Sequence, residues 1–180
     1  MKKHVFFICT LLSLLLLSCN GGSTYESLES RLSELCNEDQ EEMVKNKAIN
    51  DDFLKASPNN KDFYALSESA IETKSLSFRM EGKIGEKDVE YLSFDGNDLN
   101  ITLSDTDTEL WPTDSKVNIE FANPESGYLV LSVRAAGELI YIFKGYVHGE
   151  TGDASYNGVV YSKDGKQPFA FKDSMGYWGN

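Results

Sequence analysis

The residues that could carry out catalysis are few in this chain and lie far apart. Its 180 residues include two histidines, His4 and His148. His148 precedes a segment with two acids, Glu150 and Asp153, where an imidazole could act as a general base or as a single metal ligand. A zinc site needs three or four ligands, and one histidine does not provide them at any recognised spacing. We therefore predict that His148 is a loop residue, and that the chain is not an enzyme and holds no metal or other cofactor.

A second group of candidate ligands is acidic. Asp105, Asp107 and Glu109 alternate, so in an extended segment they would project from one side. Such carboxylates could collect a calcium ion together with loop carbonyls. The spacing is not that of an EF-hand loop, and a solvated acidic loop is the prediction. The sequence also has no Gly-x-Ser-x-Gly elbow, phosphate-binding loop or dinucleotide fingerprint.

Aromatic residues gather in the second half of the chain and could form a recognition surface. Tyrosine and tryptophan offer a large contact area at a small cost in side-chain entropy. The same residues also favour strands by propensity alone, so burial in a core is the competing interpretation. The residues that we select as a possible binding surface are Trp111, Tyr128, Tyr146, Tyr156 and Trp178.

The first 19 residues carry the most specific signal. Lys2 and Lys3 precede an almost wholly apolar run from Val5 to Leu17, which is short for a membrane-spanning helix. The run ends in Leu-Leu-Ser-Cys at residues 16–19. Here the chain resembles bacterial lipoproteins, whose lipobox has an aliphatic residue at −3, a small residue at −1 and cysteine at +1. An ordinary secretory signal with a chance cysteine is the alternative.

The resemblance implies how the chain is processed and where it resides. It implies that residues 1–18 are a signal peptide cut between Ser18 and Cys19, and that Cys19 carries diacylglycerol and further acyl chains such as palmitate. Residues 19–23 would then be a lipidated tether. Such a protein belongs to the bacterial cell envelope and binds a membrane through its lipid. The residue after Cys19 is Asn20 rather than aspartate, which favours the outer membrane over the inner membrane as the location of the protein. Location at the cell surface is a further alternative.

Charge and cysteine content limit the partners. All 29 acidic residues follow position 18 while two of the 17 basic ones precede it, so the processed chain carries a net charge of −14. This acidity excludes nucleic acid as a partner, because phosphate binding needs a basic surface. Cys9 lies in the signal peptide and Cys19 carries the lipid, which leaves Cys36 alone. We expect no intramolecular disulfide, and a thiol buried on a helix.

The elements that would position these residues change character along the chain. Apolar residues at helical spacing follow a capping box formed by Ser23 and Glu26, and predict a helix over 24–47 that is broken near 37–40. A short helical turn at 51–56 and a second helix at 61–73 complete a helical segment at 24–74. From residue 75 to 180 the apolar period switches to two, with turn residues between the runs.

These patterns predict an α+β fold in which N-terminal helices precede an antiparallel β-meander of seven or eight strands. The meander must become a helix-covered sheet or a small barrel, packed with the helices as one domain.

Three functions of the chain remain open. The first is a lipid-anchored, non-catalytic module that binds an unknown protein or small ligand. The second is an acidic periplasmic inhibitor or immunity-type protein directed against a basic enzyme. The third is an envelope hydrolase.

Overall fold

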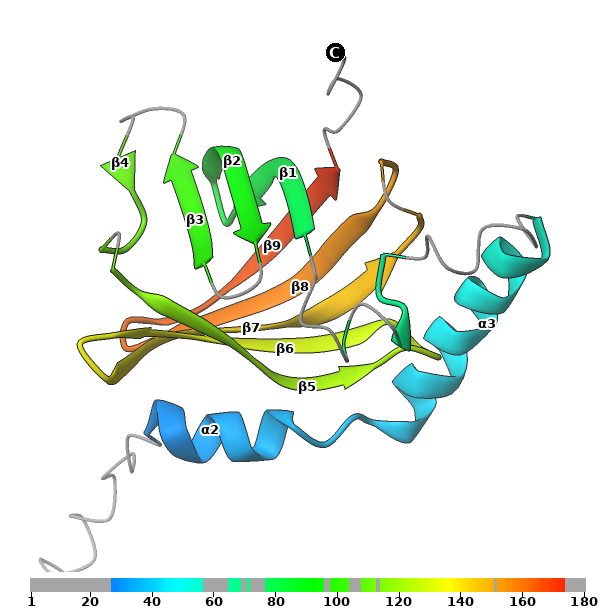
Figure 1. Cartoon of the computed structure of the whole chain (residues 1–180). Helices are drawn as coiled ribbons and strands as arrows, with labels where there is room; N and C mark the ends of the chain where they lie inside the picture. Colours follow the sequence, from blue (N-terminus) through cyan, green and yellow to red (C-terminus); the bar gives the residue numbers. More distant parts are fainter. Residues whose placement is uncertain are drawn as a thin grey trace, which may run out of the picture.

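A computed structural model of the chain describes residues 27–56, 65–68, 71, 77–95, 98–103, 108–112, 114–150 and 152–173. Within this part, helices α2 (Leu28–Leu35) and α3 (Gln40–Ala56) precede nine strands that form one antiparallel sheet (Figure 1). The predicted α+β class, with N-terminal helices and an antiparallel meander, is confirmed. Neither described helix has the length and apolar character needed to cross a membrane.

The break predicted near residues 37–40 separates the two helices. Helix α2 starts after Ser27, whose side chain accepts a hydrogen bond from the backbone N–H of Ser30 at 3.2 Å. The carboxylate of Asp39 accepts hydrogen bonds from the N–H groups of Glu41 and Glu42, at 2.9 and 3.1 Å, and so caps the start of α3. The capping box predicted at residues 23–26 lies outside the described residues.

The predicted boundary between a helix ending at residue 47 and a separate turn at 51–56 is wrong. Helix α3 runs without interruption through both segments, from Gln40 to Ala56. Residues 40–56 contain neither glycine nor proline, so no residue type breaks the helix there. Of the helix predicted at 61–73, the structure describes residues 65–68 and 71, where the N–H of Ile71 donates to the carbonyl of Ser67 in helical fashion.

The strands form two runs of hairpins. The first run is β1 (Ser77–Ile84), β2 (Lys87–Asp95), β3 (Asp98–Leu103) and the two-residue β4 (Thr108–Glu109). The second is β5 (Lys116–Asn123), β6 (Tyr128–Ala135), β7 (Glu138–His148), β8 (Ser155–Ser162) and β9 (Gly165–Asp173). Pairing of β1 with β9 joins the two runs, so the strand order is β4-β3-β2-β1-β9-β8-β7-β6-β5.

The sheet curves so strongly that its two ends approach each other, with β3 and β5 in contact. It does not close, because β4 and β5 remain its two edges. Of the two predicted arrangements, the structure is therefore an open, helix-covered sheet. Glycines allow the curvature: Gly145 of β7 pairs with Gly158 of β8, and a Cβ on Gly145 would lie 2.2 Å from the carbonyl oxygen of Asn157.

Both faces of the sheet carry apolar clusters. The inner face, inside the curve, holds the larger cluster, which includes Leu131, Phe143, Tyr156 and Phe171. The outer face packs against α2 through Leu32, which is 7% exposed. In Figure 1, α2 runs along the outside of β5 to β7 and α3 stands at one end of these strands. Strands β6 and β7 are thus covered on both faces, and residues 139–143 of β7 (Leu-Ile-Tyr-Ile-Phe) are accordingly apolar on both sides of the strand.

Candidate functional site

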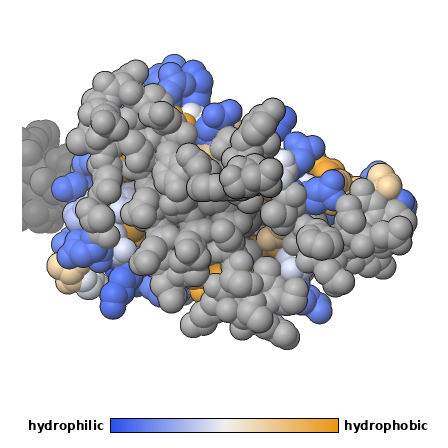
Figure 2. Space-filling view, turned by 45° about the horizontal axis from the view of Figure 1, so that its top comes forward, coloured by the Kyte–Doolittle hydropathy of each residue, from blue (hydrophilic) through white to orange (hydrophobic). Residues whose placement is uncertain are grey.

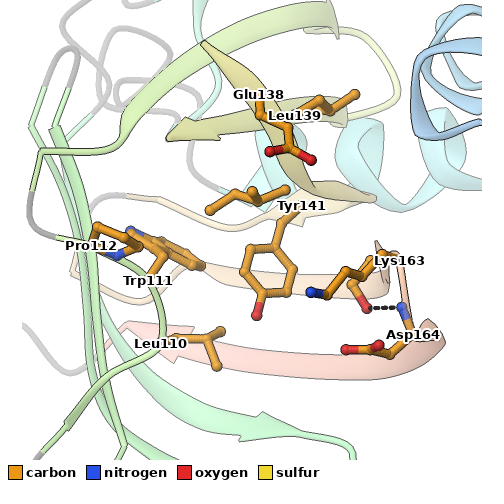
Figure 3. A pocket seen from close by; sticks show the side chains of 10 residues that line it. Leu110, Trp111, Pro112, Glu138, Leu139, Tyr141, Lys163 and Asp164 are labelled. Carbon is orange, nitrogen blue, oxygen red and sulfur yellow. Dashed lines mark hydrogen bonds between the residues drawn. The ribbon is translucent and has the colours of Figure 1, made fainter. Parts of the chain in front are cut away.

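One hollow of the molecule combines an aromatic wall with a polar rim. It has a volume of about 280 Å³ and lies at one end of the sheet, where three segments meet (Figure 3). These are the segment that follows β4, the start of β7, and the turn between β8 and β9. We call it the Trp111 cleft. Its size is at the lower end of the range for small-molecule sites.

The aromatic wall is formed by Trp111 and Tyr141, which face each other in Figure 3. Their ring centroids are 5.4 Å apart and the rings are tilted by 48°. Trp111 is only 5% exposed, and its ring also meets the ring of Phe143 edge-on at 5.9 Å. These contacts with the core hold the indole in one position, so the wall is preformed rather than assembled by a ligand.

The rim carries charged and hydroxyl groups. The turn between β8 and β9 is held by a 3.2 Å hydrogen bond that the N–H of Asp164 donates to the hydroxyl of Ser162. This turn places the exposed side chains of Lys163 and Asp164 at the mouth of the cleft, opposite Glu138. Burial, followed by the charge of Asp164, raises the pKa of Tyr141, so its phenol remains a hydrogen-bond donor at neutral pH.

The chemistry available in the Trp111 cleft is that of binding. The rings, Leu110 and Ile140 offer an apolar surface, while two carboxylates, an ammonium and hydroxyl groups offer polar contacts at its edge. Both carboxylates and the ammonium are exposed to water, which keeps them as solvated charges. Among the described residues, no three acidic, histidine or cysteine side chains are grouped to hold a metal ion.

The residues selected from the sequence do not form one binding surface, although the rings of Tyr128 and Tyr146 are in contact with centroids 5.2 Å apart. Trp111 lines the cleft. Tyr128 and Tyr156 are buried, and their hydroxyls donate to the carbonyls of Leu35 at 2.6 Å and Leu129 at 3.2 Å. Tyr146 lies on the outer face, where its hydroxyl donates to Glu42 at 3.2 Å. Trp178 lies outside the described residues.

Sequence reasoning missed the partners of Trp111. Tyr141 belongs to an apolar run whose residues predict only a covered strand, and Lys163 and Asp164 belong to a hairpin turn. No local signal indicates that these segments meet at residues 110–112, which lie about 30 and 50 positions away in the chain. Of the predicted acidic group, Asp105 and Asp107 lie outside the described residues, and Glu109 is part of β4.

Two further predicted sites are placed by the structure. His148 is not a loop residue: it ends strand β7, where it pairs with Ser155 of β8, and this prediction is wrong. Cys36 is half-buried and packs beside Leu32 at the end of α2. Burial, followed by the charge of Glu120, raises the pKa of the Cys36 thiol, which disfavours the reactive thiolate. Ser18 and Cys19 lie outside the described residues.

Comparison with known proteins supplies no relative for the Trp111 cleft. The chain matches no protein-family model, no curated protein sequence and no solved structure. The geometry of the cleft, and the resemblance of residues 1–19 to lipoprotein signals, are the observations on which a function is proposed.

Proposed function

We propose that this protein is a lipid-anchored, non-catalytic binding module of the bacterial cell envelope, and that the Trp111 cleft is its ligand site. The single observation that carries the proposal is the preformed pair of rings, Trp111 and Tyr141, at the wall of a hollow with charged groups on its rim. Few apolar surfaces of the described chain are exposed, and the face in Figure 2 is mainly hydrophilic where it is coloured. The half-buried ring of Tyr141, which lies beside the buried Trp111, is therefore the aromatic surface that a ligand would use.

The chemistry of the cleft favours a particular class of ligand. Two facing rings accept a flat apolar group by stacking or edge contact. The rim carries two carboxylates, Glu138 and Asp164, and one ammonium, Lys163, so its net charge is negative. The ligand is thus a small molecule with a flat apolar part and a polar edge that is neutral or positively charged.

Anchoring would keep this cleft near the membrane. Seven residues lie between Cys19 and Ser27, where the described chain begins, and the eight steps from one Cα to the next span at most about 28 Å when extended. Helix α2 would then lie close to the lipid surface, with the outer membrane favoured by Asn20. The module would collect its ligand at that surface without converting it.

Tryptophan fluorescence tests the proposal directly. The chain has two tryptophans, so the Trp178→Phe variant leaves Trp111 as the only one. The processed protein in detergent is titrated with a library of small aromatic and heteroaromatic amines. We expect at least one compound to change the Trp111 emission in a saturable way, and the additional change Tyr141→Ala to weaken its binding about tenfold or more.

A matched control distinguishes the effect of removing Tyr141 from the cleft wall from the effect of changing a tyrosine elsewhere in the protein. Tyr146 lies on the outer face, away from the Trp111 cleft, so Tyr146→Phe should leave the affinity unchanged. The proposal fails if no compound gives a saturable response, or if Tyr141→Ala and Tyr146→Phe bind equally well. Turnover of a bound compound would instead support the hydrolase alternative.

A further inference from the structure

The middle of helix α3 packs against the sheet through polar side chains. The buried described residues of α3 are two asparagines, Asn46 and Asn50, which are 9% and 1% exposed. Large apolar side chains of the same helix face the solvent, with Val44 64% and Ile49 45% exposed. A helix that docks on a sheet normally buries its apolar side chains. The contact between the middle of α3 and β7 is therefore made by hydrogen bonds of the two asparagines.

Both asparagines bind the same imidazole. Nδ1 of His148 lies 2.8 Å from Oδ1 of Asn50, and Nε2 lies 3.1 Å from Oδ1 of Asn46. Because the two asparagines are four positions apart, they lie on one face of the helix and bracket the ring. The ring is also stacked on that of Tyr146, with centroids 6.2 Å apart and 5° between the planes.

The side-chain amides of Asn46 and Asn50 cannot rotate by 180° to present an N–H donor to a neutral imidazole. The amide nitrogen of Asn46 donates to the carbonyl of Glu42 at 2.8 Å, and that of Asn50 donates to the carbonyl of Glu125 at 3.3 Å. A carbonyl only accepts hydrogen bonds. Rotating either amide by 180° would place its oxygen against a carbonyl oxygen and lose that bond. Both amide oxygens must therefore face the imidazole.

The number of protons follows from this arrangement. Two oxygens that face the ring nitrogens need two N–H donors, whereas a neutral imidazole has one. We infer that His148 is held as an imidazolium, and that its second proton fastens the middle of α3 to β7 as a pH-sensitive latch. Loss of this proton leaves a lone pair opposite an amide oxygen, removes one hydrogen bond and loosens the helix over residues 46–50.

Burial and hydrogen bonding act on His148 in opposite directions. Burial by itself lowers the pKa of His148, because a charged ring loses hydration. The ring is only half-buried, however, and keeps part of that hydration. Hydrogen bonds from a charged donor are roughly twice as strong as neutral ones, and an imidazolium at His148 would donate two of them, to Asn50 and Asn46. For His148 to be an imidazolium, these two hydrogen bonds must outweigh the effect of burial.

The charged groups around the latch are largely engaged elsewhere. On the α3 side, Glu42 pairs with Lys144 at 3.2 Å. In the turn between β5 and β6, Glu125 pairs with Lys47 at 3.4 Å. The partner of His148 on β8 is the uncharged Ser155, and Glu150 follows two residues beyond the strand. The amide oxygens are thus the groups that bind the ring nitrogens directly.

The latch acts locally. The start of α3 keeps its contacts through Glu42, and its end keeps the apolar contacts of Phe53 and Leu54 with the inner cluster. Deprotonation would free the middle of the helix without unfolding the domain. An imidazolium held in this way has a docked pKa above the ordinary value of 6.5, so its stabilisation would be fully present below that pH and lost as the pH rises through the docked pKa.

Nitrogen-15 NMR of the imidazole tests this inference without any variant of the latch. With His4 removed by processing or replaced by glutamine, His148 is the only histidine in the chain. We expect both ring nitrogens to carry a proton at pH 6, and the titration midpoint to lie above 6.5. We also expect the protection of the amides of residues 46–50 against hydrogen exchange to fall about tenfold or more across that midpoint.

Two variants add a matched comparison. Asn46→Asp replaces an amide oxygen by a carboxylate and should raise the midpoint, while Asn46→Leu removes an acceptor and should lower it. A single N–H at pH 6 with a midpoint below 6.5 would overturn the inference, since burial would then dominate. A midpoint above 6.5 without any change in protection would overturn the latch as well. These outcomes are independent of ligand binding in the Trp111 cleft.

Discussion

Replacement of Leu32 by alanine tests whether α2 is docked on the outer face of the sheet. Leu32 is 7% exposed and belongs to the outer cluster with Val130 and Ile142. The change removes three carbons from this cluster, worth about 2.4 kcal/mol at roughly 0.8 kcal/mol per buried methylene. A cavity left behind would add to this, but an eight-residue helix at the edge of the domain can shift to fill part of it. We expect a loss of about 2–3 kcal/mol in the free energy of unfolding.

Urea denaturation measures this loss. With an m-value of roughly 2 kcal/mol per molar urea, the midpoint should fall by about 1–1.5 M, and the slope should stay unchanged. Ile49→Ala is the matched control, because it removes the same number of carbons from a side chain that is 45% exposed. That variant should remain within about 0.5 kcal/mol of the parent protein. A loss below about 1 kcal/mol for Leu32→Ala, or equal losses for the two variants, would refute the docking of α2.

Three further predictions concern the anchor, the thiol and an ion pair. Cys19→Ala should abolish metabolic labelling with fatty acid and block cleavage of the precursor; unchanged labelling would contradict anchoring at this residue. A thiol reagent should modify Cys36 slowly in the native protein and rapidly in urea, because burial raises the pKa of this thiol; equal rates would show an accessible thiolate. Arg134 binds Glu29 through two hydrogen bonds, at 2.6 and 2.9 Å, and lowers the pKa of that carboxyl. The stabilisation of the fold by this ion pair is present above pH 4.5 and is lost as the pH falls through the folded pKa of Glu29. Arg134→Gln should therefore slightly reduce the dependence of the free energy of unfolding on acid pH. An unchanged pH profile of that free energy would count against the pair.

Local patterns account for the elements that the sequence predicted correctly. The apolar stripe with Leu28, Leu32 and Leu35 predicts α2 because a helix repeats every 3.6 residues, and this stripe packs on the outer cluster. Alternation from residue 75 onward predicts strands because successive side chains of a strand point to opposite faces. Both signals depend only on near neighbours in the chain, so a single sequence contains them in full.

Contacts between distant segments could not be predicted in this way. The sheet forms because β1 pairs with β9, which joins residues 80–84 to residues 169–173. The extent of β7 is another case: Gly149 has a positive φ of 102° and marks a turn, yet pairing with β8 carries the strand up to His148. Nothing near His148 in the sequence indicates that two asparagines of α3, about 100 positions away, bind its ring.

The sequence by itself determined the lipoprotein-like signal, the acidic charge, the helical and strand periods and the order of helices before strands. These properties follow from residue composition and from spacing within a few residues. Only the tertiary structure decided the joining of the two runs of strands through β1 and β9, the meeting of Trp111 with Tyr141 at the cleft, and the hydrogen bonding of two asparagines of α3 to His148. Each of these brings together groups that are far apart along the chain. Their proximity depends on the packing of the whole sheet, because hydrophobic burial is non-directional and does not by itself specify which segments meet.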